Sequence, residues 1–589
     1  MTTKGLILPF WLLAGAVPAL ASETGAQADS VPTFKGTYLG QTVTAERLFE
    51  GQPSWWDQVR ATGSIQTNFL IPQNDAAIGA DPVKERVLNN TYFDLTVNAP
   101  YVSVGARFEW AKWPLPGYEQ DFKGWGVPYI WATGRYKWAQ LTVGDYYEQF
   151  GSGFILRTYQ ERTLGVDNAL RGARLKLNPA QGLYLTALAG KQRAYWKHNK
   201  AWIWGANAEW SLDESFQNAF GSDYGLTLGA SYVGKYDNKD YYVEVLPEQD
   251  YTLIFPKRVA AFDGRANLRL KDFSILAEYA TKNNDPSQKN GYLYKRGSAA
   301  LLSVSYAANG FAAYIQAKRS EDMAFRSDAE DESSFTSFIN HLPAFTMTQT
   351  YALAAMYPYV TQYDGEWAFQ GEVGYKFKKG TPLGGKYGTN VRASASYIAQ
   401  LCPDVPEGAS STAPMGSDGY GTAFWKIGSL NYADLNVEIK KRVSRKVDLT
   451  FFYLYQRFNN RIMGHVPEII TANTFIHEGQ WKMSRKCQLR WEAQYLHTRQ
   501  DKGDWAAALV EFSFAPHWMF TFSDTYNIGP NHEDGTNINY YEGLITYNYK
   551  ANRFTFGYGR VRGGYNCSGG VCRWVPPYKG FSVGYNFTF

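Results

Sequence analysis

The chain has 589 residues, with 59 Lys or Arg against 54 Asp or Glu and a formal net charge of +5. The two signs are well mixed along the sequence, so no clustered basic face argues for nucleic acid or another polyelectrolyte as a partner. Aromatic residues make up 16% of the chain, including 43 Tyr and 19 Trp. Such a proportion suits the aromatic girdles of a transmembrane β-barrel.

Residues 1–21 have the three parts of a secretory signal peptide. Lys4 precedes an apolar run over residues 5–20, and the sequence Ala-Leu-Ala ends it before a polar segment. A membrane anchor is the alternative, but two prolines interrupt the run, which is short for a span of about 20 residues. We therefore predict export with cleavage after Ala21. Residues 22–58 are expected to form a short periplasmic segment, too small for a folded plug domain.

Beyond the signal peptide no stretch approaches about 18 consecutive apolar residues, so the sequence offers no candidate for a membrane-spanning helix. The four Cys are too few for a disulfide framework in a chain of this length. Cys567 and Cys572, in the loop NCSGGVC before the final strand, are spaced for a local disulfide in an oxidising compartment. Cys402 and Cys487 give no support for a second bond.

From residue 59 onward the sequence repeats one unit of about ten alternating residues, a turn, ten more and a longer loop. In 435–440, for example, Leu, Val and Ile alternate with Asn, Glu and Lys. Such alternation predicts strands with one apolar and one polar face. A soluble sandwich is the alternative, but a chain this long should then show domain boundaries. Short turns such as 444–446 instead alternate with long connections such as 236–258 and 320–348, as in transmembrane barrels.

About 25 strands can be counted, whereas a single-chain barrel of this kind needs an even number. We expect one more strand near 424–432, which gives about 26, with 24 as the next choice. The sequence thus predicts an all-β fold: a single large transmembrane antiparallel β-barrel over residues 59–589. It is expected in the outer membrane, in contact with lipid and lipopolysaccharide, with short periplasmic turns and long outer loops.

Segment 144–177 concentrates charges between two clear strands, and its apolar stretch 154–156 has little use in a solvated loop. One hypothesis is a loop that folds into the lumen as a constriction with opposed charges. The other is an ordinary outer loop whose solvated ion pairs are worth about 0–1 kcal/mol each. The constriction hypothesis rests on Asp145, Glu148, Arg157, Glu161, Arg162 and Arg174.

The same segment, together with PLGGK and YGTN in residues 382–390, resembles an uncharacterised family of outer-membrane β-barrel proteins from Bacteroidota. The resemblance implies the barrel and the compartment. It supplies no catalytic residues and no cofactor.

Enzymatic signatures are missing from the sequence. The seven His belong to no nucleophile elbow, no HExxH motif and no triad-like pattern, so we expect no enzyme. The acidic loops 320–333 and 531–539 lack the spacing of an EF-hand. We expect them to be solvated outer loops that cations can bridge to lipopolysaccharide, rather than metal sites.

The last ten residues, GFSVGYNFTF, alternate more strictly than any other stretch. A closed barrel needs its last strand to pair with its first, because only closure removes the sheet edge. The terminal aromatic also resembles the signal that barrel-assembly machinery recognises. The predicted assembly signal comprises Phe581, Val583, Tyr585, Phe587 and Phe589.

The function predicted from these patterns is a passive, porin-like conduit for solutes. The alternative is a scaffold or exit barrel that helps to assemble or export another envelope protein, with that protein as its partner.

Overall fold

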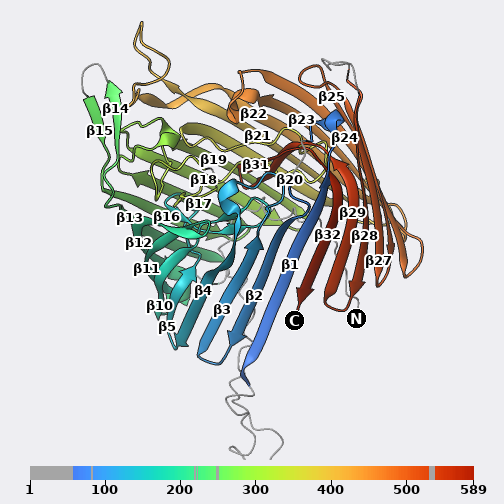
Figure 1. The fold of residues 1–589 in the computed structure, drawn as a ribbon, viewed down its shortest axis with the longest axis horizontal. Helices are drawn as coiled ribbons and strands as arrows, with labels where there is room; N and C mark the ends of the chain where they lie inside the picture. Colours follow the sequence, from blue (N-terminus) through green and yellow to red (C-terminus); the bar gives the residue numbers. More distant parts are fainter. Residues whose placement is uncertain are drawn as a thin grey trace, which may run out of the picture.

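The computed structural model describes residues 58–80, 84–217, 221, 223–246, 251–333, 335–529 and 537–589. The predicted signal peptide 1–21, nearly all of the predicted segment 22–58 and most of the loop 531–539 lie outside the described residues. Twenty-four strands form one closed antiparallel sheet, in which each strand pairs with its neighbours along the chain (Figure 1). The predicted all-β barrel is confirmed.

The barrel strands fall in two halves. The first twelve are β1 (Arg60–Gln73), β2 (Leu88–Asn98), β3 (Val102–Ala111), β4 (Gly124–Tyr136), β5 (Ala139–Tyr146), β10 (Leu170–Ala180), β11 (Leu183–Ala194), β12 (Lys197–Ser211), β13 (Tyr224–Tyr236), β16 (Arg258–Leu270), β17 (Phe273–Lys282) and β18 (Gly297–Ala308). The second twelve are β19 (Phe311–Glu321), β20 (Gly365–Phe377), β21 (Thr389–Pro403), β22 (Thr422–Arg442), β23 (Val447–Asn459), β24 (Ile469–Lys482), β25 (Cys487–Thr498), β26 (Trp505–Phe514), β27 (Trp518–Asn527), β28 (Asn539–Tyr549), β29 (Asn552–Val561) and β32 (Tyr578–Thr588).

Smaller elements lie in the connections. Four hairpins pair β6 (Gln149–Phe150) with β7 (Leu156–Arg157), β8 (Gln160–Glu161) with β9 (Val166–Asp167), β14 (Tyr242–Leu246) with β15 (Tyr251–Ile254), and β30 (Gly564–Ser568) with β31 (Val571–Val575). Helical turns are α1 (Leu212–Ser215) and the 3-10 segments Ala76–Ile78, Gln120–Phe122, Gln288–Asn290 and Asn460–Met463. Within the described residues, no helix is both long and apolar enough to cross a membrane.

The last strand closes the barrel by pairing with the first. Thr67 of β1 lies opposite Tyr585 of β32, which pairs on its other side with β29. Phe589 extends this ladder, because its N–H donates to the Gly63 carbonyl at 2.9 Å and its carbonyl oxygen accepts the Gly63 N–H at 3.0 Å. A Cβ at position 63 would lie 2.5 Å from the Phe589 ring, so glycine there leaves room for the ring against β1.

The strands present an apolar face outward, and in the half near the short turns they present a mainly polar face to the lumen. On β27, Phe520 and Phe522 are exposed on the outside, whereas Thr521 and Ser523 line the interior cavity described below. On β20, Val373 is likewise exposed. An outer surface of this kind is stable against lipid, so the barrel spans a membrane through its strands.

The barrel has 24 strands, the second of the two expected numbers, so the prediction of 26 was wrong. Segment 424–432, expected as a separate strand, belongs to β22, which runs for 21 residues. β22 continues because its pairing with β21 passes through register shifts instead of turning back.

Short turns gather at one end of the barrel and longer loops at the other. Connections 271–272, 309–310 and 443–446 are short, whereas 237–257 and 322–364 are long. The loop expected at 320–348 therefore continues to residue 364. With an even number of strands, β1 begins and β32 ends at the short-turn end, which in such barrels faces the periplasm.

Deleting Phe589 is expected to reduce the amount of assembled barrel in the outer membrane far more than the loss of one side-chain contact would. Burial of an aromatic side chain is worth about 1.5–3 kcal/mol, which is small against a closed ladder of strands. If assembly machinery reads the terminal Phe, outer-membrane levels collapse while synthesis stays normal, as immunoblots of membrane fractions would show. The matched control is Phe556→Ala, which removes an exposed ring from β29. Equal levels of truncated and full-length protein would refute the recognition role.

Candidate functional site

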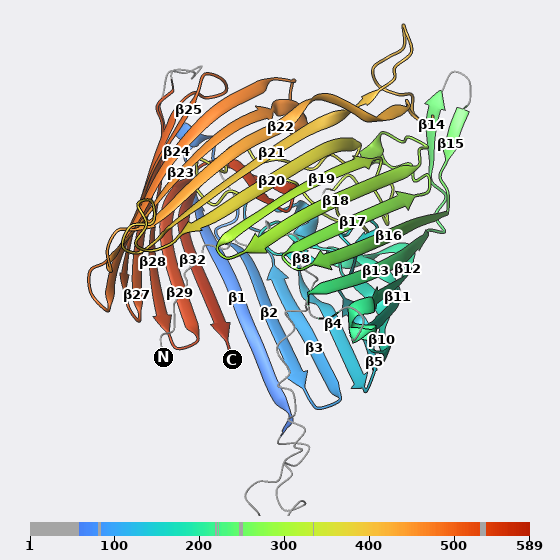
Figure 2. The ribbon, with the colours of Figure 1, turned by 180° about the vertical axis from the view of Figure 1, so that it is seen from behind.

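Two long connections and one hairpin fold back into the barrel. They are the first inner loop (residues 147–169), the second inner loop (residues 322–364) and the inner hairpin β30–β31. β31 in Figure 1 and β8 in Figure 2 lie within the outline of the barrel strands. Apolar side chains of both loops and of the lumen wall form one buried cluster, which includes Phe154, Ile155, Leu156, Phe325, Ile339, Leu342, Leu188, Ile203, Val233 and Ala368.

The inner hairpin joins the two inner loops. Its Gly570 carbonyl accepts the Thr361 N–H at 3.1 Å, and the Asn566 side-chain amide donates to the Thr163 carbonyl at 3.1 Å. A disulfide between Cys567 and Cys572 closes the hairpin, whereas Cys402 and Cys487 are free. The three segments therefore form one connected body inside the barrel.

Three lysines of the wall hold the backbone of the second inner loop. Lys235 on β13 donates to the Arg326 carbonyl at 2.8 Å, Lys282 on β17 to the Ala324 carbonyl at 2.6 Å, and Lys318 on β19 to the Pro343 carbonyl at 2.6 Å. All three side chains are buried. Because a buried ammonium is costly unless its donors are satisfied, these contacts tie the loop to a defined position.

Lys318 also forms an ion pair that is shut off from solvent. Its ammonium lies 2.7 Å from a carboxylate oxygen of Glu366 on β20, and neither side chain is exposed. Glu366 accepts hydrogen bonds from the Tyr359 hydroxyl and, at 3.0 Å, from the Gln362 N–H. The pair therefore joins adjacent strands and the end of the second inner loop.

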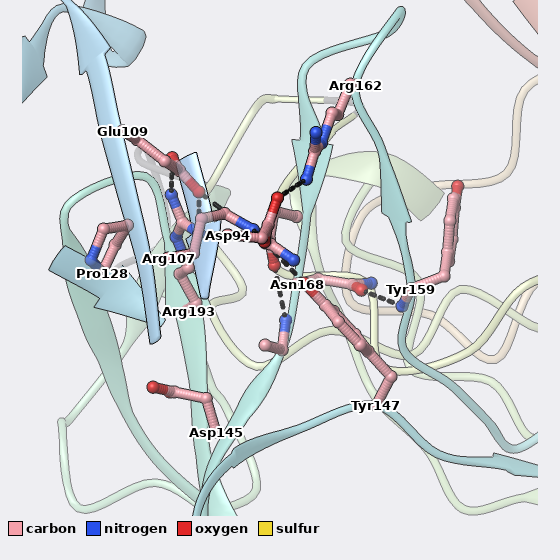
Figure 3. Close-up of polar contacts among 12 residues, drawn as sticks. Asp94, Arg107, Glu109, Pro128, Asp145, Tyr147, Tyr159, Arg162, Asn168 and Arg193 are labelled. Carbon is pink, nitrogen blue, oxygen red and sulfur yellow. Dashed lines mark hydrogen bonds and ion pairs between the residues drawn. The ribbon is translucent and has the colours of Figure 1, made fainter. Parts of the chain in front are cut away.

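Arginine–carboxylate pairs hold the first inner loop against the barrel wall (Figure 3). Asp167 of the loop lies 2.7 Å from Arg193 on β11 and 3.1 Å from Arg107 on β3. Arg193 also contacts Glu109 at 2.7 Å, and Arg107 contacts Asp94 on β2 at 2.7 Å. Charge-assisted pairs of this kind are the stronger protein hydrogen bonds, so the network fixes where the loop lies.

The tip of the first inner loop is held by a further carboxylate. Glu278 on β17 accepts the Ser152 N–H at 3.0 Å and the Ser152 hydroxyl at 2.6 Å. The loop is thus attached to the wall on both sides of its apolar centre.

The six residues of the expected constriction fall into two groups. Four form ion pairs at the wall: Asp145 with Arg171 at 2.7 Å, Glu148 with Arg174 at 3.0 Å, and Arg162 with Asp94 at 2.6 Å. Arg157 and Glu161 instead line the interior cavity. The Arg157 guanidinium lies 5.1 Å from the centre of the Tyr159 ring. The structure thus separates loop-holding charges from cavity-facing ones, and a constriction role stays a prediction.

The interior cavity has a volume of about 2700 Å³. It occupies the half of the lumen nearer the short turns: on β20, Ala368 packs in the buried cluster, whereas Glu372 and Lys376 farther along the strand line the cavity. Its lining reaches the turn residues Arg485 and Pro516 at the short-turn end. The inner loops therefore fill the outer half of the lumen and leave a polar chamber below.

His341 of the second inner loop lies at the base of the inner loops. Its backbone N–H donates to the Gly153 carbonyl of the first inner loop at 3.0 Å. Its ring meets the Tyr159 ring edge-on, with 5.6 Å between the ring centres. Burial lowers the pKa of the imidazole well below its usual range, and the charges of Arg157 and Lys318 act in the same direction. The ring is therefore neutral where the loops are docked.

The second inner loop was missed from the sequence as a lumen segment. The signal available was its content of large apolar residues, such as Ile339, Leu342 and Phe345, within an apparently polar connection. The wall lysines carried no such signal, because a polar lumen face admits charges at any inward position. Among the described residues, no group of three or more His, Cys, Asp or Glu is placed to hold a metal ion.

The chain belongs to DUF6029, a family of unknown function whose model matches residues 34–589. The expected membership of an uncharacterised family is thus confirmed. An origin in Bacteroidota stays a prediction. No curated protein matches the chain.

Among solved structures, the chain is similar at 10% identity to the P pilus usher PapC translocation pore, the siderophore receptor PirA from Pseudomonas aeruginosa and the copper transporter OprC. Each match covers 90% of this chain, and it covers 99% of PapC, 80% of PirA and 80% of OprC. The TM-scores are 0.41, 0.38 and 0.39, in the same order. Similarity at TM-scores this low gives no information about function.

Replacing Lys318 with Met is expected to destabilise the barrel strongly, because Glu366 then stays buried without its cation. Breaking a buried pair costs about 3–5 kcal/mol. The matched control is Lys440→Met, since Lys440 pairs with Glu438 but is half exposed, where such a pair is worth about 0–1 kcal/mol. Thermal unfolding in detergent, followed by the folded band on unboiled gels, compares the two. Equal midpoints would show that the buried pair is dispensable.

Acidification is expected to weaken docking of the inner loops through His341. Its pKa is lowered in the folded state, so between about pH 6.5 and that lower value the unfolded chain binds more protons. The stability contribution is present above about pH 6.5 and is lost as the pH falls. The melting temperature should therefore drop less between pH 7.5 and 5.5 in His341→Gln than in wild type or the control His517→Gln. Identical drops in all three proteins would contradict this.

Proposed function

We propose that this member of the DUF6029 family conducts solutes across the outer membrane through its lumen, and that the inner loops and inner hairpin narrow the outer half of the path. The observation that supports this most is the polar chamber of about 2700 Å³, which extends from the short turns up to the inner loops. Barrels of 16–18 strands already leave an aqueous channel. A barrel of 24 strands is wider still, so its loops must narrow the channel if passage is to be selective.

The surface of the barrel supports an outer-membrane position. The apolar outward face would contact lipid, and the longer loops would meet lipopolysaccharide at the outer end. Insertion there would depend on barrel-assembly machinery, with the strand that ends in Phe587 and Phe589 as its recognition signal.

The narrowing charges in this proposal are Arg157 and Glu161, because they alone among the six predicted constriction residues line the cavity. A cation and an anion at the edge of a confined aqueous space focus the local field, since the surrounding walls have a low dielectric constant. They would orient polar solutes at the point where the chamber meets the inner loops.

Excision of the second inner loop tests the conduit. Met323 donates its N–H to the Tyr363 carbonyl at 3.2 Å, so residues 325–361 can be replaced by a short Gly-rich turn without stretching the chain. In planar bilayers the excised barrel should show conductance steps several-fold larger than wild type, because the outer half of the lumen then fills with water.

A matched excision controls for loop removal as such. The Asp404 N–H donates to the Gly421 carbonyl at 2.8 Å, so residues 406–419 of the β21–β22 loop can be replaced by the same turn. This variant should conduct like wild type. If neither wild type nor the barrel lacking residues 325–361 conducts above background, the protein is not a conduit.

A further inference from the structure

Three successive connections at the short-turn end of the barrel carry an unbalanced positive charge. They join β20 to β21, β22 to β23 and β24 to β25. Residues 376–386, 440–446 and 482–486 contain four, five and three Lys or Arg, respectively, and no Asp or Glu. These segments are called the basic rim. In the linear sequence they are separated by long strands, and the closed sheet brings them together.

The basic rim is only slightly neutralised. Asp448 lies 3.0 Å from Lys482 and 3.5 Å from Arg442, and Glu438 lies 2.9 Å from Lys440. For Lys441, Arg485 and Lys486, the described part of the chain provides no ion-pair partner. Like charges placed close together without partners raise the folding free energy, so a cluster of this size is expected to have a ligand of opposite sign.

The basic rim faces the interior cavity rather than lipid. Lys376, Lys440 and Arg485, one from each segment, line the cavity, and so does Lys441 near the end of β22. Tyr375 and Ile439, which alternate with Lys376 and Lys440, are exposed on the outward face. Headgroups of the periplasmic leaflet would lie against the outward face, so they fit these cations poorly. The ligand is expected at the opening of the chamber.

We propose that the basic rim is a docking site for an acidic polypeptide segment that reaches the chamber from the periplasm. Two observations indicate the end from which the ligand enters and the place where it binds. The inner loops fill the outer half of the lumen, so the chamber is reached from the short-turn end. Farther inside, Glu478, Glu492 and Glu511 line the same cavity. Arg490 pairs with Glu478 and Glu492, so one cation faces three carboxylates, and the excess negative charge disfavours an acidic ligand there and holds it at the rim.

The spread of the cations selects an extended ligand over a small anion. Strands lie about 4.8 Å apart, so three turns on successive hairpins span roughly 20 Å. An extended peptide rises about 3.3 Å per residue, so roughly six residues cover the rim. This site goes beyond the proposed conduit, because docking at the rim requires no passage through the barrel.

Binding of a fluorescein-labelled octaglutamate peptide to the full barrel in detergent tests the site. Anisotropy at low salt should give an affinity at least tenfold weaker for Lys441→Gln/Arg485→Gln/Lys486→Gln than for wild type. The matched control, Arg135→Gln/Lys137→Gln/Lys271→Gln, removes the same charge from other short turns and should bind within twofold of wild type. Single charge reversal, Lys486→Glu, gives a second weakened variant should the triple variant fold poorly.

The readout does not depend on conduction, so a barrel that proves closed still gives a result. Equal affinity of all variants for octaglutamate would overturn the proposal. So would equally tight binding of the small trianion pyranine, which would make the rim a small-anion site. A third contrary result is loss of binding to phosphatidylglycerol vesicles in the rim variant while peptide binding is unchanged, which would assign the cations to lipid.

Discussion

Inside a bilayer no backbone amide or carbonyl can be left without a hydrogen bond, and the rest of this structure depends on that constraint. A sheet meets it only by closing, which is why β32 returns to pair with β1. Closure in turn demands strict register, because a shift of one residue would place an entire apolar row in the lumen. The regular alternation of the final strand is a consequence of its position at the seam.

Closing 24 strands encloses more space than the wall side chains can fill, and the polar inner face must then contact either water or protein. The protein uses both solutions, one in each half. In the outer half the inner loops bring backbone carbonyls to Lys235, Lys282 and Lys318. In the inner half similar charges stay in contact with water. One polar wall thus serves as an attachment surface at one end and as a chamber lining at the other.

The inner loops have an apolar centre, which packs on apolar residues of the wall, and a charged periphery. Phe154, Ile155 and Leu156 pack among residues from both loops and from several strands, whereas Asp167 and Ser152 meet wall charges at the loop edges. Apolar contact supplies area without direction, and the ion pairs supply direction. Together they hold a loop that the strand ladder does not hold.

The sequence by itself determined the barrel, because period-two alternation and short turns are local properties. They can be seen directly in short segments such as Phe520 to Ser523. It also indicated that segment 144–177 was unusual, from charges and apolar residues that did not suit a solvated loop. It could not determine the strand number, since alternation does not show whether residues 424–432 continue one long strand or form another. Nor could it assign Arg162 and Arg174 to ion pairs and Arg157 to the cavity, because those fates depend on partners from β2 and the first inner loop. The basic rim, too, exists only in the closed sheet, which places turns far apart in the chain side by side. Patterns within one strand are encoded locally, whereas burial and charge pairing depend on which distant segments the closed barrel brings into contact.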